Sequence, residues 1–172
     1  SQKNLIATNL SRNFVHYPNN NLLLLGKEID KTEPNFYFDL YDISTNSYLS
    51  KEILSSKKTV CSNQTSTFYL DFKDKTVKEI NFKTKKTVAT NIKIETDLPQ
   101  LFCNESNLFT VINKNNVIKT QKIALINTSD KTEKEINLKE KQILIQSFLQ
   151  NNVLIFKIYD YTNKTFSFVK DK

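Results

Sequence analysis

Apolar and polar positions alternate along several stretches of the chain. In residues 36–41, 68–72 and 154–159, every second position carries a large apolar side chain. A period of two places such side chains on one face of an extended strand. The best helix candidate, residues 129–140, has only Ile136 and Leu138 as apolar anchors, and we expect a turn and a strand there. The pattern therefore predicts an all-β chain.

Short polar clusters separate these stretches. The chain has a single glycine, Gly26, so its turns must use Asn, Asp, Lys, Ser and Thr. Asn and Asp suit this role because they tolerate the left-handed backbone region and hydrogen-bond to their own turn. The expected turns are residues 19–21, 44–47, 73–75, 84–86, 113–116, 127–132, 151–152 and 162–164. Their short spacing predicts many hairpins.

Two weak internal similarities suggest a repeat. Residues 36–48 and 154–166 both read as a strand, a turn of Asp, Thr and Asn, and a strand that opens on an aromatic residue. Residues 60–69 are similar to residues 102–109, with a cysteine at the second position of each. The two cysteines lie 42 residues apart, and a period near 40 is that of a four-stranded propeller blade.

The spacing divides the chain into four units, at about 4–55, 58–94, 98–138 and 141–169. The pattern resembles a degenerate β-propeller repeat and carries no signature of a particular family. The resemblance implies one all-β domain over residues 1–172, built as a small or partial propeller of about four blade-like units. A β-sandwich and an up-and-down β-barrel are the alternative architectures.

The sequence lacks the motifs of several catalytic classes. One glycine cannot form a Gly-rich phosphate loop or flank a serine nucleophile. The sole histidine, His16, would have to serve any histidine-dependent triad, and with two cysteines it cannot complete a zinc site. Asp71 and Asp74, three apart on an expected strand, should point to opposite faces. We therefore expect a protein that is not an enzyme and binds no metal or cofactor.

The two cysteines, Cys61 and Cys103, hold matching places in successive units and are expected on matching strands. A disulfide across neighbouring strands is one interpretation, if the protein is secreted. Two small buried thiols are the other.

Positive charge is concentrated in one part of the chain. The net charge is +7, and residues 57–93 hold nine lysines against three acids. The candidate interaction residues are Lys73, Lys75, Lys78, Lys83, Lys85 and Lys86. They would suit an acidic protein or a membrane surface, whereas the single arginine argues against nucleic acid. A solvated hairpin in a chain rich in Lys and Asn explains the same residues.

Without a reactive centre, an array of strands with polar loops favours a non-catalytic protein–protein interaction module. Candidate anchors on the polar register of the expected strands are Tyr37, Tyr41, Tyr69 and Tyr159, because tyrosine is enriched at interfaces. Packing between neighbouring units is the alternative role for these rings. A small-molecule binder for a carbohydrate or lipid, built as a β-barrel, is the alternative function.

The sequence opens on Ser1 and contains no methionine, which we interpret as a chain whose leader was removed or as a fragment. A removed leader suggests an extracytoplasmic location in the periplasm, at the outer membrane or on the cell surface. There the chain would serve as an accessory subunit of a cell-envelope or secreted assembly. Its longest apolar run, residues 22–25, is far shorter than the roughly 20 residues of a spanning helix, so only peripheral membrane contact is expected.

Overall fold

The computed structural model describes residues 14–19, 22–28, 35–56, 59–94 and 99–171. These residues form fifteen β-strands in four antiparallel sheets and no α-helix, which confirms the all-β class. No helix in them is long and apolar enough to cross a membrane. None of the four sheets closes on itself. The extent of the domain, 1–172, stays a prediction.

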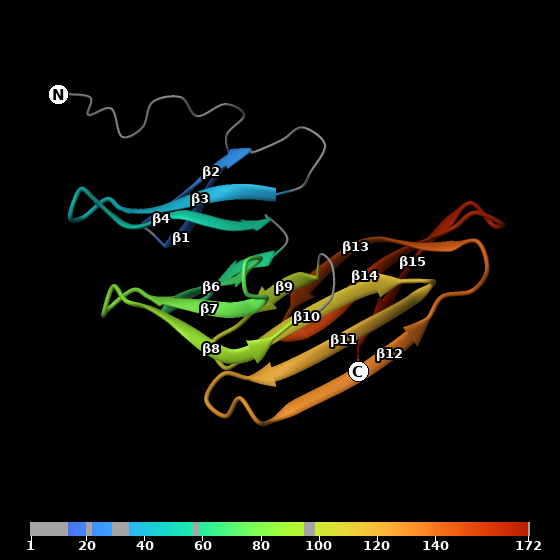
Figure 1. Cartoon of the computed structure of the whole chain (residues 1–172). Coiled ribbons are helices and arrows are strands. Elements are labelled where there is room, and N and C mark those ends of the chain that lie inside the picture. The colour runs from blue at the N-terminus through green and yellow to red at the C-terminus, as the bar shows by residue number, and fades with distance from the viewer. Residues whose placement is uncertain (1–13, 20–21, 29–34, 57–58, 95–98, 172) are drawn as a thin grey trace.

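Each sheet consists of strands that are consecutive in the chain (Figure 1). Sheet 1 contains β1 (Phe14–Asn19), β2 (Leu22–Glu28), β3 (Asn35–Asp42) and β4 (Ser47–Ser56). Sheet 2 contains β5 (Val60–Ser62), β6 (Ser66–Asp71), β7 (Thr76–Asn81) and β8 (Thr87–Lys93). Sheet 3 contains β9 (Gln100–Cys103), β10 (Asn107–Lys114), β11 (Val117–Ala124) and β12 (Lys131–Asn137). Sheet 4 contains only β13 (Gln142–Gln150), β14 (Val153–Asp160) and β15 (Thr165–Lys170).

The same turn recurs in sheets 1, 2 and 4. An aspartate closes the preceding strand, and its carboxylate accepts the backbone N–H two residues later at 2.8–2.9 Å; the three residues are Asp42, Asp71 and Asp160. Four residues after each aspartate, the backbone is left-handed, at Asn46, Lys75 and Lys164. This shared geometry is the structural counterpart of the similarity between residues 36–48 and 154–166.

Two other hairpins are closed by a pair of asparagines. Asn115 and Asn116 join β10 to β11, and Asn151 and Asn152 join β13 to β14, all four with positive φ. Two left-handed residues in succession define the type I′ turn, whose twist matches that of the flanking strands. Asparagine is well suited to this conformation, so these hairpins form in a chain that has only one glycine.

The sheets pack face to face in chain order, and each neighbouring pair shares a core. Leu40 and Ile53 of sheet 1 meet Tyr69 and Ile80 of sheet 2. Phe68, Leu70 and other side chains on the opposite face of sheet 2 meet sheet 3 in a second core cluster. A third cluster joins sheet 3 to sheet 4 through residues that include Phe109, Val111, Leu154 and Phe156. Within the described residues, no core cluster joins sheet 4 to sheet 1.

Candidate functional site

The first strands of sheets 2, 3 and 4 line an open pocket of about 530 Å³. Its walls are Val60–Ser62 of β5, Gln100–Cys103 of β9 and Ser147–Leu149 of β13. β9 lies next to both β5 and β13, so three sheets converge here. Ser147 is buried, and its hydroxyl has no hydrogen-bond partner in the described part of the chain. The pocket is therefore mainly apolar, with one buried hydroxyl that a polar atom could engage.

Both cysteines line this pocket as free, half-buried thiols. Cys61 of β5 and Cys103 of β9 both pack against the core between sheets 2 and 3. Burial raises the pKa of the Cys61 thiol well above its usual value, and its interaction with Cys103 adds to the shift. The two thiols expected on matching strands therefore lie close together in one pocket wall.

Asparagine side chains connect the turns that lie beside these first strands. Asn63 and Asn104 each close the turn after the first strand of their sheet by accepting backbone N–H groups at 2.7–3.0 Å. The Asn63 side-chain amide also donates to the Asn104 carbonyl at 3.1 Å. In turn, the Asn104 side-chain amide donates to Asn152 Oδ1 at 2.8 Å. The chain of contacts thus runs from sheet 2 through sheet 3 to sheet 4.

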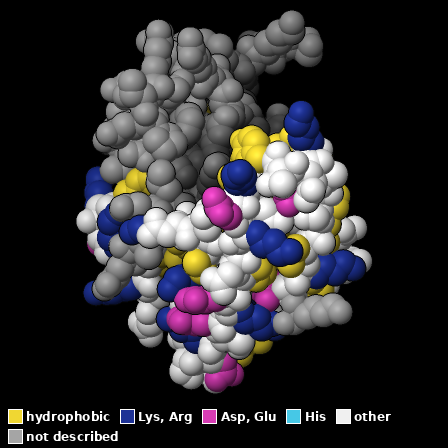
Figure 2. All heavy atoms as spheres, turned by 90° about the vertical axis from the view of Figure 1, so that its right-hand side faces the viewer, with side chains coloured by type: hydrophobic (Ala, Val, Ile, Leu, Met, Phe, Trp, Pro, Cys, Tyr) yellow, Lys and Arg dark blue, Asp and Glu magenta, His cyan; other side chains and the backbone are white. Residues whose placement is uncertain are grey.

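Five of the six candidate lysines are divided between the two ends of sheet 2, and the sixth, Lys78, lies within β7. Lys73 and Lys75 lie in the turn before β7, whereas Lys83, Lys85 and Lys86 lie in the turn after it. The six residues of β7 separate these ends by about 20 Å. On the face that Figure 2 draws, lysine side chains are scattered among acidic and apolar ones. These residues therefore do not form one continuous basic patch.

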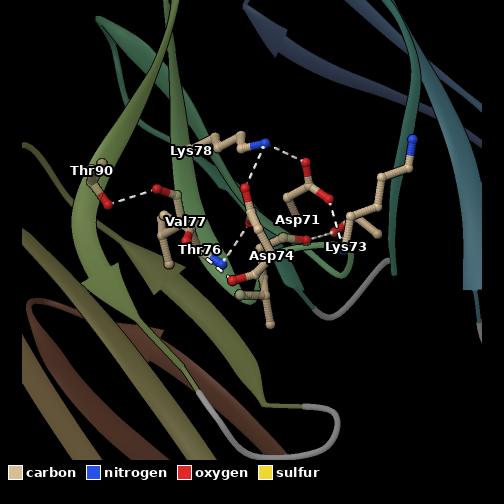
Figure 3. Close-up of polar contacts among 9 residues, drawn as sticks. Asp71, Lys73, Asp74, Thr76, Val77, Lys78 and Thr90 are labelled. Carbon is tan, nitrogen blue, oxygen red and sulfur yellow. Dashed lines mark hydrogen bonds and ion pairs between the residues drawn. The ribbon is translucent and has the colours of Figure 1, made fainter.

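Lys78 lies between two carboxylates (Figure 3). Its ammonium is 2.5 Å from Asp71 Oδ2 and 3.0 Å from Asp74 Oδ2. The hydrogen bond with Asp71 is the main reason that the pKa of Lys78 is raised. The expectation that Asp71 and Asp74 point apart is wrong, because Asp74 lies in the turn and folds back over the strand. The three residues form a local ion-pair cluster in which the charge of Lys78 is compensated.

Lys85 forms an ion pair with Asp42, which links sheet 2 to sheet 1. The Asp42 carboxylate is fully buried, and it also accepts hydrogen bonds from the backbone and hydroxyl of Ser44. The hydrogen bonds from Lys85 and Ser44 hold the pKa of Asp42 well below its usual range. Lys85 therefore has a structural role, since its ion pair with Asp42 joins sheet 2 to sheet 1.

Two of the four candidate tyrosines lie in the core. Tyr41 and Tyr69 are each only 5% exposed, so the expectation that they present their rings on the surface is wrong. Burial raises the pKa of Tyr69 to about 12. Tyr69 packs in the core between sheets 1 and 2. The side chains of Tyr37 and His16 lie outside the described residues.

The fourth tyrosine, Tyr159, belongs to an exposed surface that sequence reasoning missed. The register of sheet 4 places its side chain on the face opposite sheet 3, where aromatic and aliphatic residues gather around a lysine. We call this the aromatic face; its aromatic, aliphatic and basic members are Ile143, Phe148, Ile155, Lys157, Tyr159, Phe166, Phe168 and Lys170. Phe166 is 56% exposed and Phe168 is 62% exposed. The alternation of Thr165, Phe166, Ser167 and Phe168 was the available signal.

The rings of the aromatic face contact one another across all three strands. Tyr159 and Phe166 have ring centroids 4.9 Å apart, and Phe148 and Phe168 have centroids 6.5 Å apart. Lys157 Nζ lies 4.4 Å from the centroid of the Phe166 ring, a cation–π arrangement. These contacts hold the exposed rings in a defined arrangement at the end of the stack.

Comparison with known proteins supplies no relative. No protein-family model matches the chain, and no curated protein matches it at the significance required of a relative. The function must therefore be argued from the fold and from the two features described above, the pocket and the aromatic face.

Proposed function

We propose that the chain is a non-catalytic protein–protein interaction module that docks through the aromatic face of sheet 4. The observation that carries this proposal is the exposure of Phe166 and Phe168 on a sheet face that none of the other described sheets covers. Soluble proteins rarely expose contiguous apolar patches, and those they expose often mark interaction sites. Aromatic side chains are enriched among the residues that dominate binding energy.

Continuity with the rest of the stack identifies the kind of surface that would cover this face. Three cores form where one sheet packs on the next, and the outer face of sheet 4 offers the same residue types without a neighbour among the described sheets. Sheet 4 also has three strands where each of the others has four. This serial order supports a propeller-like arc, which remains part of the proposal. A further β-sheet surface, supplied by another protein, is the occupant we propose.

The charge of the aromatic face indicates the chemistry of the partner surface. Lys157 and Lys170 belong to the aromatic face by their register with Phe168 and Ile155. The only acid in β13, β14 and β15 is Asp160, which accepts hydrogen bonds in its own turn. The face therefore carries two positive charges and no negative one from these strands. We expect a partner surface that is apolar with carboxylates opposite the lysines, as in an acidic protein subunit.

The test is the mass of the native particle isolated from its source, with the co-purifying chains identified. The double substitution Phe166→Ser and Phe168→Ser should release the partner, and Lys157→Glu should weaken the complex by charge repulsion. Ile126→Ser is the matched control, because Ile126 is also an exposed apolar residue but lies in a turn of sheet 3. It should leave the complex intact.

Three outcomes would overturn this proposal. A lone 20 kDa monomer that binds no protein would remove its basis. Dimerisation of the purified chain that the phenylalanine substitutions abolish would make a second copy the occupant. Binding to vesicles of anionic lipid that depends on the same residues would make the face a membrane surface. The accessory role in a cell-envelope or secreted assembly depends on the identity of the partner.

The pocket favours a second candidate function, the binding of a small molecule. Its volume of about 530 Å³ lies within the range of ligand sites, and an apolar lining with few polar groups is typical of them. Ser147 supplies the unpartnered hydroxyl. Mass analysis of compounds extracted from the native protein tests this function. A bound compound that Ser147→Phe displaces would support it, and an empty extract would count against it.

A further inference from the structure

The pocket brings together the only two cysteines of the chain, and they come from different sheets. Cys61 pairs with Phe68 across β5 and β6, and Cys103 pairs with Leu108 across β9 and β10. Phe68 and Leu108 belong to the same core cluster, and both cysteines pack against that cluster and line the same pocket. Strands β5 and β9 are neighbours without belonging to one sheet.

The thiols can be reached from the pocket. Both are half-buried and both form part of its wall. Among the described residues that line the pocket, the cysteines are the only ones with an ionisable side chain. No charged side chain of this described lining therefore pairs with either sulfur, and the described part of the chain holds no set of three metal-ligating residues. The chemistry left to two adjacent, accessible thiols is oxidation to a disulfide.

We propose that Cys61 and Cys103 are a disulfide-forming pair that covalently joins sheet 2 to sheet 3. The oxidant is a disulfide, either a small molecule or an oxidoreductase. One of the two cysteines, as its thiolate, attacks one sulfur of this reagent, forms a mixed disulfide and expels one thiolate. The other cysteine, as its thiolate, then attacks the protein sulfur of that mixed disulfide, forms the internal bond and expels the second thiolate. The protein loses two electrons and two protons, and the reagent becomes two thiols.

The bond would fall where it constrains the fold strongly. Only side-chain packing and turn contacts hold β5 against β9, since hydrogen-bonded pairing stays within each sheet. The bridge would close a loop spanning 42 residues of sequence separation. Cross-linking residues this far apart removes much of the freedom of the unfolded chain. We therefore expect the oxidised protein to melt about 5–15 °C above the reduced protein.

The experiment treats the reduced, folded full chain with oxidised glutathione. Intact-mass measurement and peptide mapping should show a loss of two hydrogens and a Cys61–Cys103 cross-link within one chain. The melting temperature should rise and return to its starting value when dithiothreitol is added. Cys61→Ser and Cys103→Ser, tested separately, should each retain one glutathione as a stable mixed disulfide, because the second thiol that would expel it is absent.

Several results would overturn the pair. Two glutathiones per chain, a cross-link between two chains, thiols that stay unmodified, or an internal bond that forms only in denaturant would each show that the folded protein does not bring the sulfurs together. Circular dichroism of the two serine variants establishes that they are folded. The wild-type comparison of reduced and oxidised protein needs no variant. The result is independent of the aromatic face, so failure here leaves the proposed interaction function standing.

Discussion

Strand β6 of sheet 2 and strand β15 of sheet 4 have similar sequences and opposite environments. Each strand carries two large apolar side chains two positions apart. These are Phe68 and Leu70 in β6, and Phe166 and Phe168 in β15. All six residues of β6 are buried, whereas five of the six residues of β15 are exposed. The difference comes from position in the stack, because sheet 2 has a neighbour on both faces.

The comparison also shows which face of sheet 4 is incomplete. Val169 and Ser167 of β15 point toward sheet 3, and Phe166 and Phe168 point away from it. The more apolar register of the strand therefore faces solvent. In a sheet with one buried face, the apolar side chains normally point to that face. The opposite arrangement in β15 therefore supports a partner surface that covers the outer face of sheet 4.

The largest expected effect is a difference in unfolding free energy between two variants, each of which truncates one phenylalanine, in β6 or in β15. Phe68→Ala should lower the free energy of unfolding by about 3–5 kcal/mol, because it opens a cavity in a packed core. Phe168→Ala, at an exposed ring, should change it by less than about 0.5 kcal/mol. Urea unfolding of the isolated chain measures both. Equal losses would show that the aromatic face is buried in the isolated protein and would remove the contrast.

Asp42 and Asp160 give a second comparison, because they start equivalent turns in sheets 1 and 4. Asp42 is buried and paired with Lys85 of the next sheet, whereas the hydrogen bonds of Asp160 stay within sheet 4. Asp42→Asn should cost about 1–3 kcal/mol at pH 7, because a buried charge-assisted contact is lost. Asp160→Asn should cost less. Chemical denaturation at pH 7 provides the ranking.

The contribution of Asp42 should also depend on pH. Its pKa in the folded protein is lowered from the usual value of 3.8. A lowered carboxylate pKa gives stability that is fully present above the usual pKa and is lost as pH falls through the folded pKa. The difference in unfolding free energy between wild type and Asp42→Asn should therefore be constant from pH 7 to about pH 5 and shrink below pH 4. A difference that is as large at pH 2 as at pH 7 would contradict the ionic origin.

The sequence was sufficient for the strands and most turns because these depend on neighbouring residues. Asn151 and Asn152 form the expected turn, and residues 131–137 form the strand expected in place of a helix. These features follow from alternation and from the backbone preferences of Asn, which act within a few residues. The propeller arrangement stays a prediction, because no local pattern specifies how sheets close around an axis.

Burial by other sheets could not be read from the sequence in the same way. Tyr69 occupies a polar-looking register but is covered by Leu40 and Ile53 of the preceding sheet. The aromatic face shows the converse, since Phe166 and Phe168 alternate along their strand as core residues do but are exposed, and no described sheet covers them. Alternation distinguishes the two faces of a strand, and only the neighbours in space decide which of them is buried. The separation of the lysines could be read from the sequence, because the turns at residues 73–75 and 84–86 lie at opposite ends of the strand between them.

Asn104 tests the contacts between turns, at a smaller expected effect. Its side chain closes its own turn and donates to Asn152 of sheet 4. Asn127 closes a turn of sheet 3 through contacts within that turn alone. Asn104→Ala should cost about 1–2 kcal/mol and Asn127→Ala about 0.5–1 kcal/mol, measured by urea unfolding. Equal costs would show that the contacts between sheets add nothing to those within the turn.

The smallest expected effect is the gain in stability from a glycine in the recurring turn, compared between interior sheet 2 and terminal sheet 4. Lys75 of sheet 2 and Lys164 of sheet 4 hold the fourth position of equivalent loops, with φ of 57° and 52°. Glycine adopts this left-handed conformation without the steric cost that lysine bears. Lys75→Gly and Lys164→Gly should each raise the unfolding free energy by about 0.5 kcal/mol. Differential scanning calorimetry should then show similar small rises in melting temperature for the two variants. Because this gain is local, it should be equal in the interior sheet and in the terminal sheet, unlike the effect of truncating the phenylalanines. A gain confined to one of the two turns would mean that stack position acts on the backbone of the loop as well as on side-chain burial.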